Sequence, residues 1–475
     1  MRFREKLQLL KYVLFPAAGL VLILLYIRAA AADVVYSDYI RLINEYLPDV
    51  TDLSRMLTPD ILTRIPACFL ARLVNVSSFG YSVSFDRILS VIGLGLTAAC
   101  LSNYIFAKEI RIGWQIVLWV VLFSLNKWEI LLNGTAWAHM VSFGLFFISY
   151  LLLDLVWTGE ASPRQEFLIC AMPLVMLLFA GEYIVSYACT LILVCLMGVL
   201  TGGANSWAGR REQTIFRHVL VSAGAALLLY ILSRSFAVWE HAGATELSLA
   251  EVVKSSPAFL PRFFLKTFAG AVIGQETIAA FFPGGAALPD ALVIAAGAFV
   301  LGGYVLALFL YFHADLLEKT IFPLILLISG FANHLLVTAA RWIFLREEYA
   351  LSSRYAGQFM IGLLGMVLVF SMSGRQKRSY RREGQTMRGI LRALTLLTAV
   401  FLLAGNLYTS WQEIRKAKYR EANYEHMAGV LLEYEQYTPE ELSAVLEWHK
   451  DPVDAVEAAG ILRENRLNVF SRPHF

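Results

Sequence analysis

The chain has 475 residues, of which 58% are hydrophobic and 16% are charged, and its formal net charge is +3. Soluble domains carry about 25% charged residues, so this composition excludes an ordinary soluble protein and indicates an integral membrane protein. The basic residues do not gather into a stripe along the chain, so no nucleic-acid partner is predicted.

From the N-terminus onward, apolar segments recur that are long enough, or nearly long enough, to cross a hydrocarbon layer of about 30 Å. The first is about 20 residues long, so we expect it to be retained as a helix and not removed as a signal peptide. The predicted fold is an all-α transmembrane bundle of about eleven spans. These spans are residues 12–32, 86–107, 112–126, 137–157, 166–180, 183–201, 217–237, 289–313, 320–340, 355–373 and 391–410.

Lysine and arginine are concentrated in alternate loops between these segments. The densest group, in residues 375–392, lies between two apolar segments, where membrane proteins keep their cytosolic positive charge. The alternation predicts that the N-terminus lies inside, that the number of spans is odd and that the C-terminal tail lies outside.

Three long segments then fall on the outer side of the membrane: 33–85, 239–288 and 411–475. Helical spacing of apolar residues within the first two predicts helices that lie in the membrane interface, at 39–47, 61–74 and 261–266. In the tail, Thr438, Pro439 and Glu441 form a helix-start pattern, and 452–465 predicts a further helix. We therefore expect a transmembrane domain over 1–410 and an extracytoplasmic helical tail over 411–475.

An acidic residue, Asp38, follows the first span at the predicted outer boundary of the membrane. A carboxylate within hydrogen-bond reach of a hydroxyl can act as a general base on a substrate brought by a lipid carrier. Asp33 and Arg41 are further candidates in the same segment. The alternative is that Asp38 is the N-cap of the following helix, a position that favours Asp.

Arg354 and Tyr355 stand at the outer start of a late span. An arginine there can bind a phosphate through two parallel hydrogen bonds, and the alternative is an anchor at the membrane interface. Other basic residues of the outward segments would form a positive vestibule for a lipid-linked phosphate, or would be surface charges balanced by acids. They are Arg64, Arg72, Arg262, Lys266 and Arg341.

Several other polar residues have simpler interpretations. His139, at the outer end of one span, and His334, within another, are expected to make hydrogen bonds between helices. Glu182 divides the apolar runs 166–180 and 183–201, which are either two spans or one kinked feature. Because a carboxylate is costly in lipid, a tight turn at the surface is the favoured interpretation. Lys127 and Glu129 are expected to pair with each other.

The motifs of several enzyme classes are missing from the sequence. It contains no phosphate-binding loop, no dinucleotide-binding glycine pattern and no HExxH, and its five cysteines have no paired spacing. No metal and no cofactor are therefore predicted. Few ionisable residues stand near the centres of the spans, which disfavours an ion-coupled transporter.

The order of these features resembles the GT-C superfamily of membrane glycosyltransferases, in which a first span is followed by a long outward loop that opens with an acid, here Asp38. The stretch Ser353-Arg354-Tyr355 looks like the Arg-Tyr element of many bacterial members. Residues 461–470 are similar to endings of bacterial glucosyltransferase-type proteins that modify surface polysaccharides. Ser37 stands where many members have a second acid, and this departure puts the metal-dependent versions in doubt.

The resemblance implies an enzyme of a bacterial inner membrane that moves a sugar from a polyprenyl-phosphate donor to an extracytoplasmic glycan or lipid acceptor. Asp38 would take the acceptor proton, and the donor phosphate would be bound by Arg354, Tyr355, Arg64 and Arg72. Alternatives are a translocase (flippase) or a polymerase or ligase of lipid-linked polysaccharide, and a non-enzymatic membrane scaffold. A translocase is expected to expose polar groups along a passage through the membrane, whereas a transferase gathers them at one face.

Overall fold

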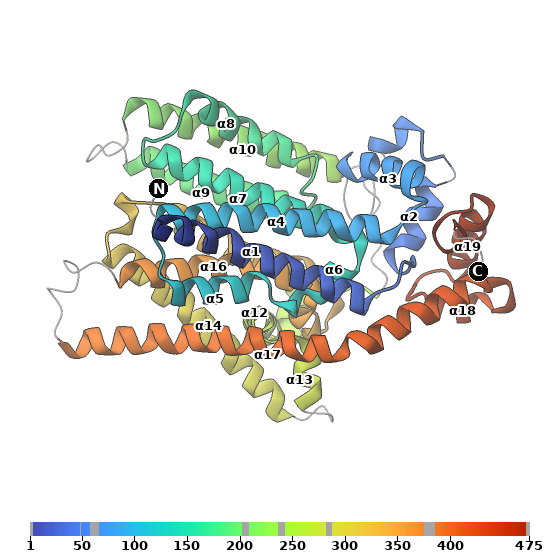
Figure 1. Ribbon diagram of the computed structural model, residues 1–475. Helices are drawn as coiled ribbons and strands as arrows, with labels where there is room; N and C mark the ends of the chain where they lie inside the picture. The colour runs from blue at the N-terminus through green and yellow to red at the C-terminus, as the bar shows by residue number, and fades with distance from the viewer. Residues whose placement is uncertain are drawn as a thin grey trace.

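The computed structural model describes residues 3–47, 49–57, 66–201, 209–235, 243–281, 287–374 and 385–471. Within these residues all regular structure is helical, and no strand occurs (Figure 1). Ten of the described segments are helical, long and apolar enough to cross a membrane, which makes this a membrane-integral helical protein. They are α1 (Phe3–Ala30), α4 (Val83–Ala107), α5 (Ile112–Leu122) with the short α6 (Trp128–Leu132) after it, α7 (Trp137–Trp157), α9 (Tyr183–Thr201), α10 (Arg210–Arg234), α14 (Ala287–His313), α15 (Phe322–Arg341), α16 (Ser353–Ser373) and α17 (Gln385–Leu432).

The core of the bundle lies around α16, which is buried along nearly its whole length. The backbones of α16 and α15 pack closely together at two glycines. A Cβ atom added at Gly330 would lie only 2.3 Å from the Cα atom of Gly362. Small residues let helix backbones approach each other in a membrane, where apolar burial alone does not drive helices together. In contrast, α1, α10 and α14 expose leucine, valine and phenylalanine side chains, as helices that face lipid do.

The segment predicted as a span over 166–180 forms a shorter helix, α8 (Pro163–Met176), of 14 residues. Near its start, Glu166 pairs with Arg211 of α10 at 2.6 Å, and just beyond its end the Leu178 carbonyl accepts a hydrogen bond from Ala67 at 3.0 Å. With 14 residues, α8 is shorter than a membrane span requires and is not one of the ten candidate spans, against the eleven predicted. Helices α8 and α9 are separate elements.

The first and last described residues lie at opposite ends of the bundle (Figure 1). An odd number of passages through the bundle would also place the two ends in this way, and the exact number of spans stays a prediction. Which end faces the cytosol stays a prediction from the distribution of lysine and arginine.

The helix predicted at 39–47 occurs as α2 (Asp38–Tyr46). Of the helix predicted at 61–74, residues 66–74 lie in α3 (Pro66–Phe79), and residues 61–65 lie outside the described residues. In the tail, α18 (Pro439–Val445) begins with the predicted capping box between Thr438 and Glu441, and α19 (Val453–Glu464) follows. The expected domain boundary at residue 410 falls inside the continuous helix α17. The helix expected at 261–266 occurs within α12 (Phe259–Gly270), which packs into the bundle against α14 and α15.

The tail and the first outward segment pack on each other at one end of the bundle, on the right of Figure 1. The Ser37 N–H donates to the Leu446 carbonyl at 2.7 Å, and the Asn468 N–H donates to the Gly80 carbonyl at 2.7 Å. The Asn44 side chain also donates to the Asp454 carbonyl at 2.9 Å. Segments about 400 residues apart in sequence therefore form one layer over the end of the bundle, and this layer encloses the site described next.

Candidate functional site

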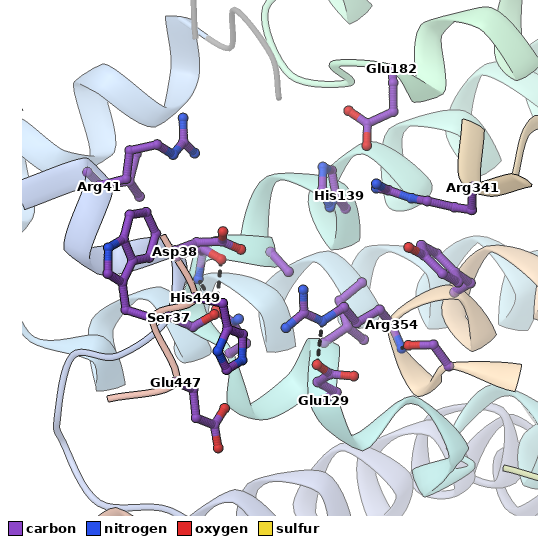
Figure 2. A pocket seen from close by; sticks show the side chains of 18 of the residues that line it. Ser37, Asp38, Arg41, Glu129, His139, Glu182, Arg341, Arg354, Glu447 and His449 are labelled. Carbon is purple, nitrogen blue, oxygen red and sulfur yellow. Dashed lines mark hydrogen bonds and ion pairs between the residues drawn. The ribbon is translucent and has the colours of Figure 1, made fainter. Parts of the chain in front are cut away.

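A cavity of about 960 Å³ lies at this end of the bundle, between the transmembrane helices and the layer formed by the tail. Its walls come from α2, α3, α6, the first turns of α7 and α16, the turn before α9 and the tail. A volume of this size accommodates a substrate of several rings, and the walls combine aromatic rings with carboxylates and guanidinium groups. Figure 2 shows the charged residues that line it.

Asp38 is the first residue of α2, and Ser37 occupies the N-cap position. The Ser37 side chain makes no capping hydrogen bond, and its backbone has a positive φ of 51°. The alternative that Asp38 is the N-cap is therefore wrong by one position. Asp38 lines the cavity, and its carboxylate and the Arg354 guanidinium point toward one another across it (Figure 2). The two charges interact electrostatically.

Arg354 lies in the first turn of α16 and is held by Glu129 of α6. The Arg354 Nε donates to Glu129 Oε1, and the Ser353 hydroxyl donates to Glu129 Oε2 at 3.0 Å. The Arg354 side chain stays 46% exposed, compared with 21% for Glu129, so the guanidinium still faces the cavity. Arginine bound to a carboxylate through one edge keeps other N–H groups for an anion.

The expected pair between Lys127 and Glu129 is wrong. The Lys127 ammonium is buried and donates to the carbonyls of Leu122 and Ser124, each at 2.7 Å. Residues two apart on a helix do not face each other, so Lys127 and Glu129 diverge.

Three further arginines line the same cavity. They are Arg72 and Arg341 of the predicted basic set, and Arg41, the candidate from the segment after the first span. The Arg72 guanidinium lies 4.2 Å from the ring centroid of Tyr46, and that of Arg341 lies 5.6 Å from the ring centroid of Tyr355. Cation–π contacts of this kind orient a guanidinium without using up its hydrogen-bond donors. Tyr355 also lines this cavity, whose walls carry carboxylates as well as guanidinium groups, so the positive vestibule for a lipid-linked phosphate stays a prediction.

Two other members of the predicted basic set do not line the cavity. Arg262 and Lys266 of α12 instead form a closed network of ion pairs with Asp290 and Glu347, with Arg262 2.6 Å from Asp290 and 2.9 Å from Glu347. Their charge is balanced within this network, in agreement with the alternative prediction that these basic residues are balanced by acids. Arg64 lies outside the described residues.

Asp33, the second acidic candidate, has a structural role. Its carboxylate accepts hydrogen bonds from the Ser82 hydroxyl at 2.7 Å and from the Val83 N–H at 2.6 Å. These groups lie at the start of α4, where backbone N–H groups have no partner within the helix. Asp33 thus fixes the start of α4 and does not line the cavity.

His139 and Glu182 both line the cavity. Glu182 lies in the tight turn expected between α8 and α9, where Gly181 has a positive φ of 53°. The His139 ring meets the Tyr183 ring edge-on at a centroid distance of 4.7 Å. His139 therefore packs against an aromatic wall of the cavity. His334 behaves as expected of a helix–helix contact, since its Nδ1 lies 2.9 Å from the Thr267 hydroxyl of α12.

Sequence reasoning missed a group of tail residues, Glu447 to Lys450, that form part of the cavity wall. Glu447 has a positive φ of 55°, which is unusual for a residue with a side chain. Burial and the negative charge of Glu129 raise the pKa of the Glu447 carboxyl above its usual range, while the positive charges of Arg354, His449 and Arg420 oppose the rise. No local pattern in the sequence indicates that this segment, some 400 residues after Asp38, reaches the same cavity.

The cavity is therefore lined by both a carboxylate, Asp38, and a guanidinium, Arg354. The Arg354 guanidinium faces the cavity, where it can bind an anion. Among the residues that the structure describes, no group of three or more histidine, cysteine, aspartate or glutamate side chains is placed to hold a metal ion. Comparisons of the chain with protein-family models, curated proteins and solved structures found no match.

Proposed function

We propose that the protein is a membrane glycosyltransferase that moves a sugar from a polyprenyl-phosphate donor to an acceptor at one face of a bacterial plasma membrane. The single observation that carries this proposal is the position of Asp38 and Arg354, which face each other across one cavity at the end of the membrane bundle. A base and an anion-binding group on opposite sides of a reacting carbon are what sugar transfer from a phosphate requires.

In the proposed reaction, Asp38 removes the proton from an acceptor hydroxyl as its oxygen forms a bond to the anomeric carbon of the sugar. The bond between that carbon and the phosphate oxygen breaks, and the polyprenyl phosphate leaves with the electron pair. Arg354 stabilises the negative charge that develops on the leaving phosphate. Glu129 keeps the guanidinium in place, so that little reorganisation is needed during the reaction.

The positions of other arginines support a phosphate ligand at the bundle side of the cavity. Arg341 stands at the end of α15 and Arg354 at the start of α16, so both lie at the ends of helices long enough to cross the membrane. A donor whose polyprenyl tail stays in the membrane would present its phosphate at this depth. Arg72 adds a third guanidinium from α3.

The alternative of a translocase is less well supported by the polar residues within the bundle. His334 lies between the rings of Phe268 and Phe359, at centroid distances of 3.8 Å and 4.3 Å, and does not border the cavity. A translocase needs polar groups along a passage through the membrane, whereas the His334 side chain is enclosed by aromatic rings. A scaffold would leave Asp38 and Arg354 facing bulk water. A polymerase or ligase would share the donor chemistry and differ in its acceptor.

The test is turnover of a polyprenyl-phosphate sugar by the protein reconstituted in vesicles, comparing the wild type with Asp38→Asn. We expect the loss of the base to reduce turnover by a factor of about 10² to 10⁴. Asp49→Asn is the matched control, because Asp49 precedes an exposed turn outside the cavity and its substitution should leave turnover unchanged. Unchanged turnover in folded Asp38→Asn would contradict the assignment of Asp38 as base.

A further inference from the structure

Resting on the proposed function, we infer that the tail segment 447–450 forms the acceptor-binding wall of the cavity, that Glu447 binds the acceptor hydroxyl, and that the acceptor is a water-soluble glycan. The inference begins with the two ends of the cavity. His139, Glu182 and Arg341 stand on the side of the membrane helices, and Glu447 and His449 stand on the other side of Asp38 (Figure 2).

The two ends differ in their distance from lipid. The bundle end is built from the first turns of α7 and α16, the end of α15 and the turn before α9, all of which continue into the membrane. The opposite end is built from the tail, whose helices α18 and α19 lie at the far end of the molecule from most of the bundle (Figure 1). A lipid-linked donor reaches the first end from the membrane, so the second end is left for an acceptor that arrives from water.

The backbone ties Glu447 to the proposed base. Ser37 and Glu447 both have positive φ angles, 51° and 55°, and the Ser37 N–H donates at 2.7 Å to the carbonyl of Leu446, the residue before Glu447. Asp38 and Glu447 therefore each follow one partner of the same hydrogen bond. Backbone conformations that most side chains avoid are found disproportionately at functional sites, where the surrounding structure holds them.

The tail segment is also held rigidly, as a binding wall must be. The Trp448 N–H donates to the Ser443 carbonyl at 2.9 Å, the Ser443 hydroxyl donates to the Trp448 carbonyl at 2.5 Å, and the Trp448 indole N–H donates to the Asp451 carbonyl at 3.0 Å. Trp448 is thereby fixed, whereas Glu447, His449 and Lys450 are exposed to the cavity. A carboxylate, an imidazole and an ammonium group offer the hydrogen bonds that sugar hydroxyls need.

The experiment follows radiolabelled sugar from a polyprenyl-phosphate glucose donor in reconstituted vesicles. Water alone, the envelope polysaccharide fraction of the source organism and its total lipid extract are supplied as acceptors in separate arms. The wild type is expected to label the polysaccharide and not the lipid. Glu447→Gln is expected to raise the KM for the polysaccharide at least tenfold and to leave the donor KM unchanged. Glu440→Gln, an exposed glutamate of α18 outside the cavity, is the control and should match the wild type.

A second variant keeps the test independent of folding. Glycine adopts a positive φ readily, so Glu447→Gly removes the side chain without straining the backbone. It should melt no lower than the wild type and show the same raised KM as Glu447→Gln. Label in the lipid arm alone, or an unchanged KM in both variants, would overturn the inference while leaving glycosyl transfer intact. A wild type that releases no label in any arm would instead overturn the proposed function, and the inference with it.

Discussion

Arg354 on α16 donates a hydrogen bond to Glu129 on α6 in the wall of the cavity, although 225 residues separate the two in the sequence. The bond uses the Nε atom of Arg354, which leaves the two terminal nitrogens of the guanidinium as the donors nearest the cavity (Figure 2). Glu129 therefore sets the direction of the group that we propose binds the donor phosphate.

Arg354→Lys tests this geometry without removing the positive charge. A lysine ammonium cannot bind Glu129 with one edge and a phosphate with another, so the charge loses its direction. We expect turnover of the polyprenyl-phosphate sugar to fall by a factor of about 10² to 10³, the usual effect of losing one group that stabilises developing charge. Arg463→Lys is the matched control, since Arg463 pairs with Glu435 on the exposed surface of the tail. Equal turnover in the Arg354 and Arg463 variants would contradict the role of Arg354.

Lys266→Met tests whether the ion-pair network of α12 stabilises the fold. The Lys266 side chain is only 7% exposed and contacts both Asp290 and Glu347, so its loss leaves two carboxylates close together without their buried partner. We expect the free energy of unfolding in detergent to fall by about 2 kcal/mol. This is less than the usual cost of breaking a buried ion pair, because both acids are partly exposed. The melting temperature measures this loss, and Arg463→Met should leave it unchanged. An Lys266→Met variant as stable as the wild type would show that the network adds no stability.

Acceptor binding is expected to depend on pH through Glu447. Partial burial in the cavity wall and the charge of Glu129 raise the pKa of its carboxyl, so Glu447 takes up a proton at a higher pH than a glutamate on an open surface does. The ionised carboxylate is the form that accepts a hydrogen bond from a hydroxyl. The KM for the acceptor should therefore rise as the pH falls through this raised pKa, and should stay constant above it.

The measurement is the acceptor KM over a pH series that begins at the ordinary pKa of glutamate, about 4.3, and extends upward. Glu129, Arg354, His449 and Arg420 also act on Glu447, so the comparison needs a variant that leaves all four in place. Glu447→Gln is that variant, and its KM should lose the dependence on pH. The same pH dependence in Glu447→Gln would assign it to one of the other groups.

Local patterns predicted much of the fold. The apolar segments became helices because the backbone must satisfy its own hydrogen bonds in lipid, and the Thr438 and Glu441 pattern became a capping box because both contacts lie within one helical turn. The segment predicted as a span over 166–180 forms a helix of only 14 residues. Apolar content indicates whether a segment enters the membrane, but it does not determine where the helix ends.

Sequence patterns predicted less of the candidate site. The places of Asp38 and Arg354 beside spans indicate them as candidates, but their partners depend on distant packing. The sequence pairs Glu129 with its near neighbour Lys127, whereas Glu129 contacts Arg354. Glu447 reaches the cavity because the tail folds back over α2. The sequence predicts the same role for Arg262, Lys266 and Arg72, as basic residues of outward segments. Arg262 and Lys266 instead form ion pairs with Asp290 and Glu347, which lie beside them in the fold.

Native mass spectrometry of the purified protein released from detergent tests whether this cavity binds a lipid-linked phosphate. We expect an added mass equal to a polyprenyl phosphate on the wild type and on the surface control Arg463→Ala, and the loss of that mass in Arg354→Ala. Wild-type protein that carries no polyprenyl phosphate after incubation with it, or Arg354→Ala protein that keeps it in full, would show that Arg354 does not bind such a phosphate in this cavity.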